Sequence, residues 1–257
     1  MKLCNYFGMI RFLILLSLSG TAHASPSFDL VDTHPNSPEF KQRFYGSFGI
    51  NSAIEPILTQ ADRPLYESIA PYLQNKPEKA IELAKKGITK TSNAAFDYLV
   101  GSLYYIQCNY SDAASYLNAA LKKFPDFRRA HRNLALIYIQ QDNYETAIKH
   151  LLRVIELGGG EGQSYSMLAY AYLTEEKYQS ALSAYQLARM FLPDSIDVRR
   201  GEAQCLLMTQ QYGAAIALFD ELISEHPDEQ DYWLFQANSY LSQNQVDDAI
   251  ANLEIAH

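Results

Sequence analysis

The sequence predicts an all-α fold built by stacking pairs of helices, and three observations lead to this prediction. Alanine recurs every 34 residues along most of the chain, proline recurs at the same interval, and the apolar residues between them are spaced as in an amphipathic helix. The chain has 257 residues, of which 48% are apolar and 19% charged. This composition excludes a disordered tail, a collagen-like fibre and a disulfide-dense miniprotein. It is compatible with an array of small units that has no central core.

Five series of residues share one register. They are Ala113, Ala147, Ala181, Ala215 and Ala249; Gly101, Ala135, Ala169, Ala203 and Ala237; Tyr110, Tyr144, Tyr178 and Tyr212; Tyr104, Tyr138, Tyr172, Leu206 and Tyr240; and Pro125, Gly159, Pro193 and Pro227. Where two helices cross closely, a small side chain lets the backbones approach, and larger side chains fill the flanking space. The first two series therefore mark helix crossings.

Each period contains two helices. Residues 165–172 and 178–185 carry the spacing of an apolar helix face, and the polar residues 174–177 separate them. Proline near the end of a period closes the second helix. In one period a glycine-rich stretch, 158–162, stands in place of proline, and we expect a loosened turn there. No strand precedes this stretch and no Lys-Ser/Thr follows it, so it is not expected to bind phosphate.

The 34-residue helix-turn-helix unit, with small residues at its eighth and twentieth positions and proline near its end, resembles the tetratricopeptide repeat family. The resemblance implies a right-handed α-solenoid over residues 61–257. We place complete units at 94–127, 128–161, 162–195 and 196–229, and an incomplete unit at 230–257. Residues 61–93 resemble a degenerate unit, in which Pro71 should break or bend the first helix. Because His257 falls inside a predicted helix with no capping helix after it, we expect a fragment or a docked end.

Residues 1–24 have the features of a secretory signal peptide. Lys2 and Arg11 supply positive charge, residues 12–18 form an apolar run, and Ala22-His23-Ala24 precedes Ser25 as a cleavage site. A permanent membrane anchor is the alternative, but a spanning helix needs about 20 apolar residues. The prediction is an exported protein, periplasmic or secreted, cleaved near Ala24 and Ser25 and with no membrane span after cleavage.

Residues 25–60 lie between this signal and the array. They are expected to cap the apolar face of the first unit, with an independent binding segment as the alternative. The formal charge of -8 argues against nucleic acid or anionic lipid as a partner. Cys108 and Cys205 are expected to be buried thiols that form no disulfide, because they lie three units apart.

The resemblance implies that the first helix of each unit lines a concave groove with its second, fifth, ninth and twelfth positions. The candidate groove residues are Tyr98, Tyr105, Arg129, Arg132, Tyr170, Arg200 and Asn238. Arg129 and Arg132 share a helix face. Guanidinium groups beside tyrosine rings suit a peptide that carries carboxylates or aromatic rings. The alternative is a solvated face, or pairing with acids such as Asp126 and Glu161.

Two further groove positions qualify this expectation. Some family members grip a terminal carboxylate with a clamp that includes asparagine, but the matching ninth positions here are Ser102, Leu136 and Tyr170. Clamp-type chaperone binding is therefore not expected. The twelfth positions form an apolar row of Tyr105, Ile139, Leu173, Leu207 and Leu241. This row either packs against the neighbouring unit or leaves an apolar floor for a peptide.

No catalytic site, cofactor or metal is predicted. The six histidines include no pair at i, i+4 and no cluster with cysteine, and no nucleophile elbow surrounds any serine. The expected function is that of an exported scaffold or assembly factor, not an enzyme, which binds a protein or peptide in the groove. The alternative is the regulatory or substrate-presenting part of a longer enzyme or envelope-assembly machine. A weaker alternative is binding of envelope polysaccharide through the tyrosines.

Overall fold

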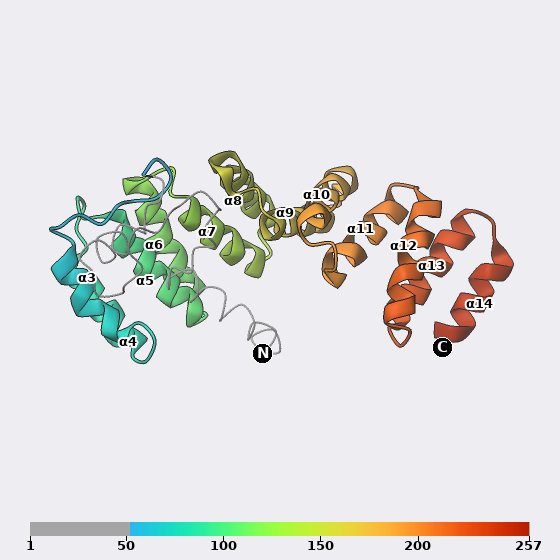
Figure 1. Ribbon diagram of the computed structural model, residues 1–257, viewed down its shortest axis with the longest axis horizontal. Helices are drawn as coiled ribbons and strands as arrows, with labels where there is room; N and C mark the ends of the chain where they lie inside the picture. The colour runs from blue at the N-terminus through green and yellow to red at the C-terminus, as the bar shows by residue number, and fades with distance from the viewer. Residues whose placement is uncertain (1–51, 257) are drawn as a thin grey trace, which may run out of the picture. The chain divides into compact units, whose positions relative to one another are not determined.

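The computed structural model describes residues 52–256 (Figure 1). The predicted signal peptide at 1–24, its cleavage site, most of the 25–60 segment and His257 lie outside the described residues. Every regular element between residues 52 and 256 is a helix, and this stretch contains no strand. The predicted all-α class is therefore confirmed.

From Ala94 onward the helices come in pairs, an odd-numbered first helix and an even-numbered second helix. Before the pairs stand α3 (Arg63–Ile69), η3 (Ala70–Tyr72) and α4 (Pro77–Gly87). The first helices are α5 (Ala94–Ile106), α7 (Arg128–Gln140), α9 (Gly162–Thr174), α11 (Ile196–Met208) and α13 (Gln230–Ser242). The second helices are α6 (Tyr110–Lys123), α8 (Tyr144–Val154), α10 (Tyr178–Phe191), α12 (Tyr212–Glu225) and α14 (Val246–Ala256).

The chain divides into two compact units, one ending at Asn133 and the other starting at Leu134. In the first unit, one cluster of buried side chains joins α4 and α5, including Ala84 and Phe96. In the second unit, a larger cluster runs from Ala135 on α7 to Tyr232 on α13. Each unit thus buries the apolar faces of its own helices against their neighbours in sequence, as expected for repeats without a central core.

Small residues stand where the paired helices cross. The nine alanines of the first two series have no exposed surface: Ala113, Ala135, Ala147, Ala169, Ala181, Ala203, Ala215, Ala237 and Ala249. At the equivalent position in α5, a Cβ on Gly101 would lie only 2.8 Å from Cγ of Leu117 and 3.1 Å from the carbonyl oxygen of Ala113. The backbones of α5 and α6 therefore approach too closely for any larger side chain.

The turn inside each pair has one conformation. A residue with positive φ recurs every 34 residues: Cys108, Asp142, Glu176, Gln210 and Asn244. In the first of these turns the amide of Asn109 donates to the carbonyl of Tyr104 at 3.0 Å, and that of Cys108 donates to Tyr105 at 2.9 Å. This pattern is a Schellman motif, which satisfies the last carbonyls of the first helix.

The same motif explains a wrong prediction about the cysteines. Cys205 is buried, but Cys108 is exposed, and neither forms a disulfide. Cys108 occupies the left-handed position of its turn, with φ of 59°. Helical periodicity does not extend into this turn, so the burial pattern of the helix does not apply to Cys108.

Proline and glycine act where the sequence predicted interruptions. The prediction for Pro71 is confirmed, because α3 stops at Ile69 and a short 3₁₀ turn containing Pro71 follows. In the glycine-rich stretch, α8 passes into a π turn, η4 (Ile155–Gly159), rather than ending before a proline. Gly158 has φ of 78° there, a conformation that other residues adopt only with strain.

Candidate functional site

Arg129, at the start of α7, lies on two aromatic rings and binds a carboxylate. Its Nε donates to Oε2 of Glu55 at 2.8 Å. The guanidinium carbon is 5.5 Å from the ring centroid of Tyr98 and 5.9 Å from that of Phe127. The two rings contact each other, with centroids 4.7 Å apart. Arg129, Tyr98 and Phe127, which we name the Arg129 site, thus combine cation–π contact with carboxylate recognition.

The carboxylate in this site is largely removed from water. Glu55 is only 6% exposed, and its burial raises the pKa of the carboxyl group although Arg129 acts in the opposite direction. Burial also tends to lower the pKa of Arg129, but Tyr98 and Glu55 together raise it. The other oxygen of Glu55, Oε1, is buried and has no hydrogen-bond partner. Oε2 is therefore hydrogen-bonded to Arg129, whereas Oε1 is buried without a hydrogen bond to offset its loss of contact with water.

Glu55 belongs to a segment that precedes the helices of the array, and the residues around it are held by main-chain contacts. The amide of Arg128 donates to the carbonyl of Ile54 at 3.1 Å. The side-chain amide of Asn93 donates to the carbonyl of Ile57 at 2.7 Å. Leu58 is buried in the core cluster that joins α4 and α5. We name residues 54–58 the docked segment.

Two predicted groove residues in the first unit are not on the surface. Tyr98 is 2% and Tyr105 6% exposed, so the expectation that they line an open groove is wrong. Tyr98 packs against Phe127, with Arg129 over its ring, and Tyr105 packs against the ring of Tyr110 at 5.9 Å. Burial is also the main cause of the raised pKa of Tyr105.

The two predicted arginines differ in their surroundings. The predicted alternative for Arg129 was pairing with acids such as Asp126 and Glu161, and the structure shows an ion pair with a third acid, Glu55. The sequence singled out Arg129 and missed Glu55, because no repeat position marks a residue in the preceding segment. Arg132 is partly buried on the same helix.

In the second unit the predicted groove residues are open. Tyr170 on α9 is 47% exposed, and Arg200 on α11 and Asn238 on α13 are also exposed. Leu234 and Leu241, two large apolar residues of α13, are exposed as well. We name these five residues the first-helix surface. Arg200 is paired with the exposed Asp197 at 3.0 Å, one turn away on the same helix.

Tyr170 and Arg200 both act on one buried phenol. Burial is the main cause of the raised pKa of Tyr185 on α10; Tyr170 adds to this rise electrostatically, whereas Arg200 opposes it. The Tyr185 ring also fills the space beside Gly201, where a Cβ would lie 2.2 Å from it. Tyr170 on α9 and Arg200 on α11 thus both influence the same phenol electrostatically. The ring of Tyr170 is further fixed edge-on to Tyr144, with centroids 6.0 Å apart.

The apolar row at the twelfth positions mainly packs. Ile139, Leu173 and Leu207 are partly buried against the core cluster of the second unit. Tyr105 is buried in the first unit, whereas Leu241 is 47% exposed. Of the two interpretations of this row, packing describes four members and an apolar floor describes only Leu241.

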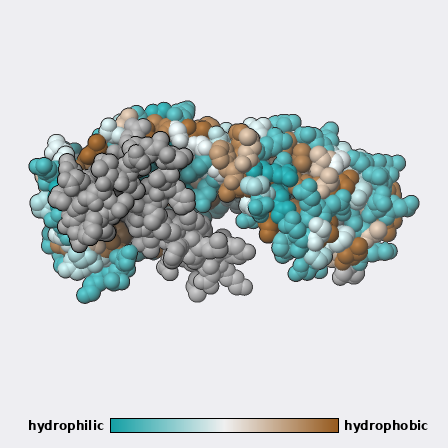
Figure 2. Space-filling view, in the orientation of Figure 1, coloured by the Kyte–Doolittle hydropathy of each residue, from teal (hydrophilic) through white to brown (hydrophobic). Residues whose placement is uncertain are grey.

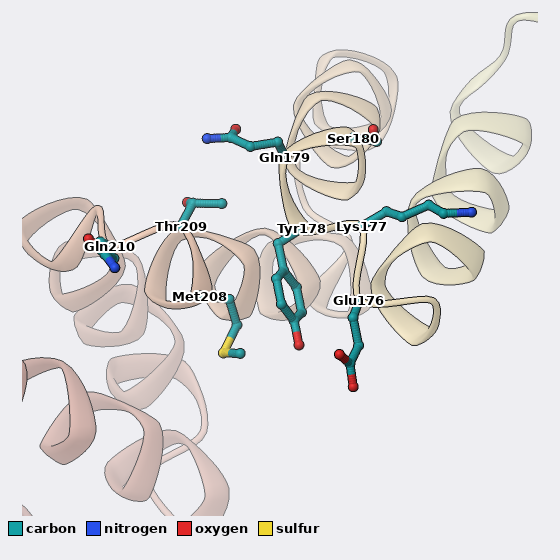
Figure 3. A pocket seen from close by; sticks show the side chains of 8 residues that line it. All are labelled: Glu176, Lys177, Tyr178, Gln179, Ser180, Met208, Thr209 and Gln210. Carbon is teal, nitrogen blue, oxygen red and sulfur yellow. The ribbon is translucent and has the colours of Figure 1, made fainter.

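A different hollow lies along the turns of the second unit (Figure 3). It is lined by Glu176, Lys177, Tyr178, Gln179, Ser180, Met208, Thr209 and Gln210. Tyr178, Met208 and Glu176 point to one side of the two turns, whereas Gln179 points to the other (Figure 3). The hollow is open, and its polar groups do not converge on one point. Sequence reasoning missed it, because its lining combines the ends of α10 and α11 with the turns beside them, and no repeat position predicts that these residues share a hollow.

Within residues 52–256, no group of three or more His, Cys, Asp and Glu side chains could hold a metal ion. None of the helices in that range is both long and apolar enough to cross a membrane. On the face shown in Figure 2, the visible surface of the described helices is largely hydrophilic, with apolar groups scattered over it.

Comparisons with known proteins agree with the helix pairs. Tetratricopeptide repeat models match residues 98–161 and 172–239, together about half of the chain. No curated protein matches the sequence. Among solved structures, the chain is similar to YrrB, described as a TPR protein with an unusual peptide-binding site. The TM-score is 0.63 at 19% identity, over 71% of this chain and 91% of that one.

Two further structures show the same fold. A tetratricopeptide repeat protein from Parabacteroides merdae gives a TM-score of 0.58 at 19% identity, over 76% of this chain and 78% of that one. MamA from Desulfovibrio magneticus also gives 0.58, at 17% identity, over 66% of this chain and 98% of that one. The predicted α-solenoid of helical repeats is thereby confirmed. On the evidence of its two matched stretches and of the helix pairs that fill them, the chain belongs to the tetratricopeptide repeat family.

Proposed function

We propose that this protein is an exported interaction scaffold or assembly factor that binds a protein or peptide on the first-helix surface of its second unit. The observation that carries the proposal is that Tyr170, Arg200 and Asn238 are exposed on three successive first helices. Tyrosine and arginine are the side chains that most often supply binding energy at interfaces. Because the helices are already formed, binding orders little of the scaffold.

The chemistry of this surface favours a peptide with both an acidic and an apolar group. Arg200 offers a guanidinium whose present partner, Asp197, is highly exposed, and such a surface pair is weak. A carboxylate on the partner can therefore replace Asp197. Leu234 and Leu241 provide apolar contact on α13. The peptide-binding site named in the description of YrrB supports a peptide as the ligand.

The experiment is affinity capture from a cell-envelope fraction, with the captured partner then titrated against variants. Arg200→Ala combined with Tyr170→Ala is expected to weaken binding at least about tenfold, since both residues are anchors of the surface. Helicity should not change, because both side chains are exposed. Normal binding by the folded double variant would refute the assignment.

Lys149→Ala is the matched control for this experiment. Like Arg200, Lys149 is an exposed cation paired with an acid on its own helix, Glu145 at 2.9 Å. It lies on α8, a second helix of a pair, outside the first-helix surface. It should bind the partner as the wild type does, and a loss equal to that of the double variant would point to a general charge effect.

A second candidate function has one observation in its favour. The last described helix, α14, exposes four apolar residues: Val246, Ile250, Leu253 and Ile255. In a repeat array the face of a second helix is normally covered by the next element. An exposed apolar face of this kind is suited to contact with another protein surface, so it supports a regulatory or substrate-presenting role of the repeats within an enzyme or assembly machine. The gene sequence beyond codon 257 tests it: a catalytic domain there would support this candidate.

A further inference from the structure

We infer that the Arg129 site is a receptor for a peptide in which glutamate is followed by proline, and that the docked segment of the chain occupies this receptor as an internal ligand. A partner protein with the same chemistry would have to displace the docked segment. This inference concerns the first unit only and does not depend on the function proposed for the second.

The contacts that hold the docked segment are of the kind that hold a bound peptide: hydrogen bonds to its main chain and an ion pair to one side chain. Its carbonyl groups at Ile54 and Ile57 each accept one hydrogen bond, from the amide of Arg128 and the side chain of Asn93. Glu55, between them, supplies the one charged contact, to Arg129. Main-chain hydrogen bonds of this kind give affinity without regard to sequence, while side-chain pockets give specificity.

The receptor is held in place by contacts that do not involve the docked segment. Tyr98 and Phe127 form a platform in which the two rings contact each other, and Arg129 rests on both. Asn93 is fixed as the N-cap of α5, where its side-chain oxygen accepts from the amide of Ala95 at 3.0 Å. A preformed site loses little conformational freedom on binding.

The order of buried and exposed residues defines the ligand. Glu55, Pro56 and Leu58 are buried, whereas Ile57 is exposed. The site therefore recognises an acidic residue, a proline directly after it and an apolar residue at the third position after the acid. The residue between the proline and this apolar residue contributes only its carbonyl group, which Asn93 binds.

The docked segment lacks one hydrogen bond in its site, so a partner that makes this bond can displace it. Oε1 of Glu55 is buried with no hydrogen-bond partner, so the carboxylate is desolvated without full compensation. A partner that satisfies both carboxylate oxygens, or that adds contacts beyond residues 54–58, would bind more tightly than the docked segment.

The test uses a fluorescent peptide with the sequence of residues 52–62 and the full chain, with binding followed by anisotropy. Wild type should bind the peptide weakly, because its site is occupied. Glu55→Ala, which loses the charged contact of the docked segment, should bind the peptide at least about tenfold more tightly. Adding Arg129→Ala to the Glu55→Ala chain should abolish this gain. A peptide with glutamine in place of its Glu55 should bind neither wild type nor the Glu55→Ala chain.

Two control variants test whether the tighter binding belongs to the Arg129 site. Glu145→Ala removes an exposed glutamate that pairs with Lys149, and it should bind the peptide as weakly as wild type does. Arg200→Ala in the Glu55→Ala background should keep the gain, because Arg200 lies in the second unit. Loss of the gain with Arg200→Ala would place the peptide on the first-helix surface and overturn the inference.

A second measurement does not depend on the folding of any variant. Excess peptide added to wild type should shift the NMR amide signals of Glu55, Ile57 and Leu58, as the docked segment leaves its site. Unchanged signals at saturating peptide, or equal affinity of wild type and a folded Glu55→Ala chain, would show that the docked segment is a permanent part of the fold and would refute the inference.

Discussion

Arg199 and Glu225 form a two-point ion pair between the two helices of one repeat. Nη1 of Arg199 donates to Oε1 of Glu225 at 2.7 Å, and Nη2 donates to Oε2 at 2.6 Å. They are the fourth and thirtieth residues of their 34-residue unit. Asp97 and Lys123 stand at the same two positions of an earlier unit and also form an ion pair, with the charges reversed. Both repeats therefore have an ion pair at these two positions, but the acidic and the basic residue have exchanged places.

The reversed pairs predict that the charges of Arg199 and Glu225 can be exchanged. Arg199→Glu alone would place two carboxylates together at the largely buried position of Arg199, so the melting temperature should fall clearly. Arg199→Glu with Glu225→Arg should restore most of the loss, because the two sites are directly coupled. Thermal unfolding followed by circular dichroism measures both effects.

Arg200→Glu is the control for this exchange. Arg200 neighbours Arg199 in sequence, but its partner Asp197 is exposed and on the same helix, and such pairs contribute little. The melting temperature should therefore fall less than with Arg199→Glu. A double exchange that is as unstable as the single variant would show that the two-point pair has no structural role.

The same pair predicts part of the acid sensitivity. The hydrogen bond from Arg199 is the main cause that lowers the pKa of Glu225 below its ordinary value of 4.5. A carboxylate with a lowered folded-state pKa contributes stability above its unfolded pKa, and this contribution is lost as the pH falls through the folded-state pKa. Glu225→Gln should therefore flatten the loss of stability below about pH 4.5.

Asp97 should act in the opposite direction. Burial is the main cause that raises its pKa above the ordinary 3.8, although Lys123 opposes this. Protonation of Asp97 then favours the folded state as the pH falls, so Asp97→Asn should make the acid loss steeper than in wild type. Urea unfolding at several pH values between about 3 and 7 measures both slopes. Equal slopes for the two variants would contradict the assignment.

Periodicity predicted the fold because its cause is local. A helix crossing tolerates only a small residue, so Ala181 and its equivalents mark each crossing in the sequence itself. The binding sites depend on contacts that have no fixed spacing. Arg129 was predicted from its helix position, but Glu55 lies 74 residues before it and outside the repeats. Tyr98 has the expected position as well, yet its burial depends on Phe127 and Arg129, which no repeat rule brings to it.

The turns predict a simple route to a more stable protein. Gln210 has φ of 63°, in the left-handed region, where a side chain costs free energy and glycine does not. Gln210→Gly should raise the free energy of unfolding by about 0.5 to 1 kcal/mol, after allowing for the greater freedom of glycine in the unfolded chain. Urea unfolding measures the change.

Two variants at the same position control for loss of the glutamine side chain. Gln210→Ala should give no such gain, because alanine has the same difficulty with positive φ. Gln210→Val should destabilise the protein, because a β-branched residue is least tolerated there. If glycine and alanine have the same effect, backbone strain is not what limits stability at this turn.

The helix crossings predict that a larger side chain at a buried alanine lowers the free energy of unfolding. Ala181 has no exposed surface and belongs to the core cluster of the second unit. Three additional carbon atoms in Ala181→Leu would force α9 and α10 apart, and the expected cost is about 1 to 3 kcal/mol of unfolding free energy. Ala214→Leu is the matched control, because Ala214 is exposed on α12 and the same change there meets solvent. Equal stability of the two variants would mean that Ala181 does not mark a close crossing, since solvent exposure and tight packing cannot have the same effect on a larger side chain.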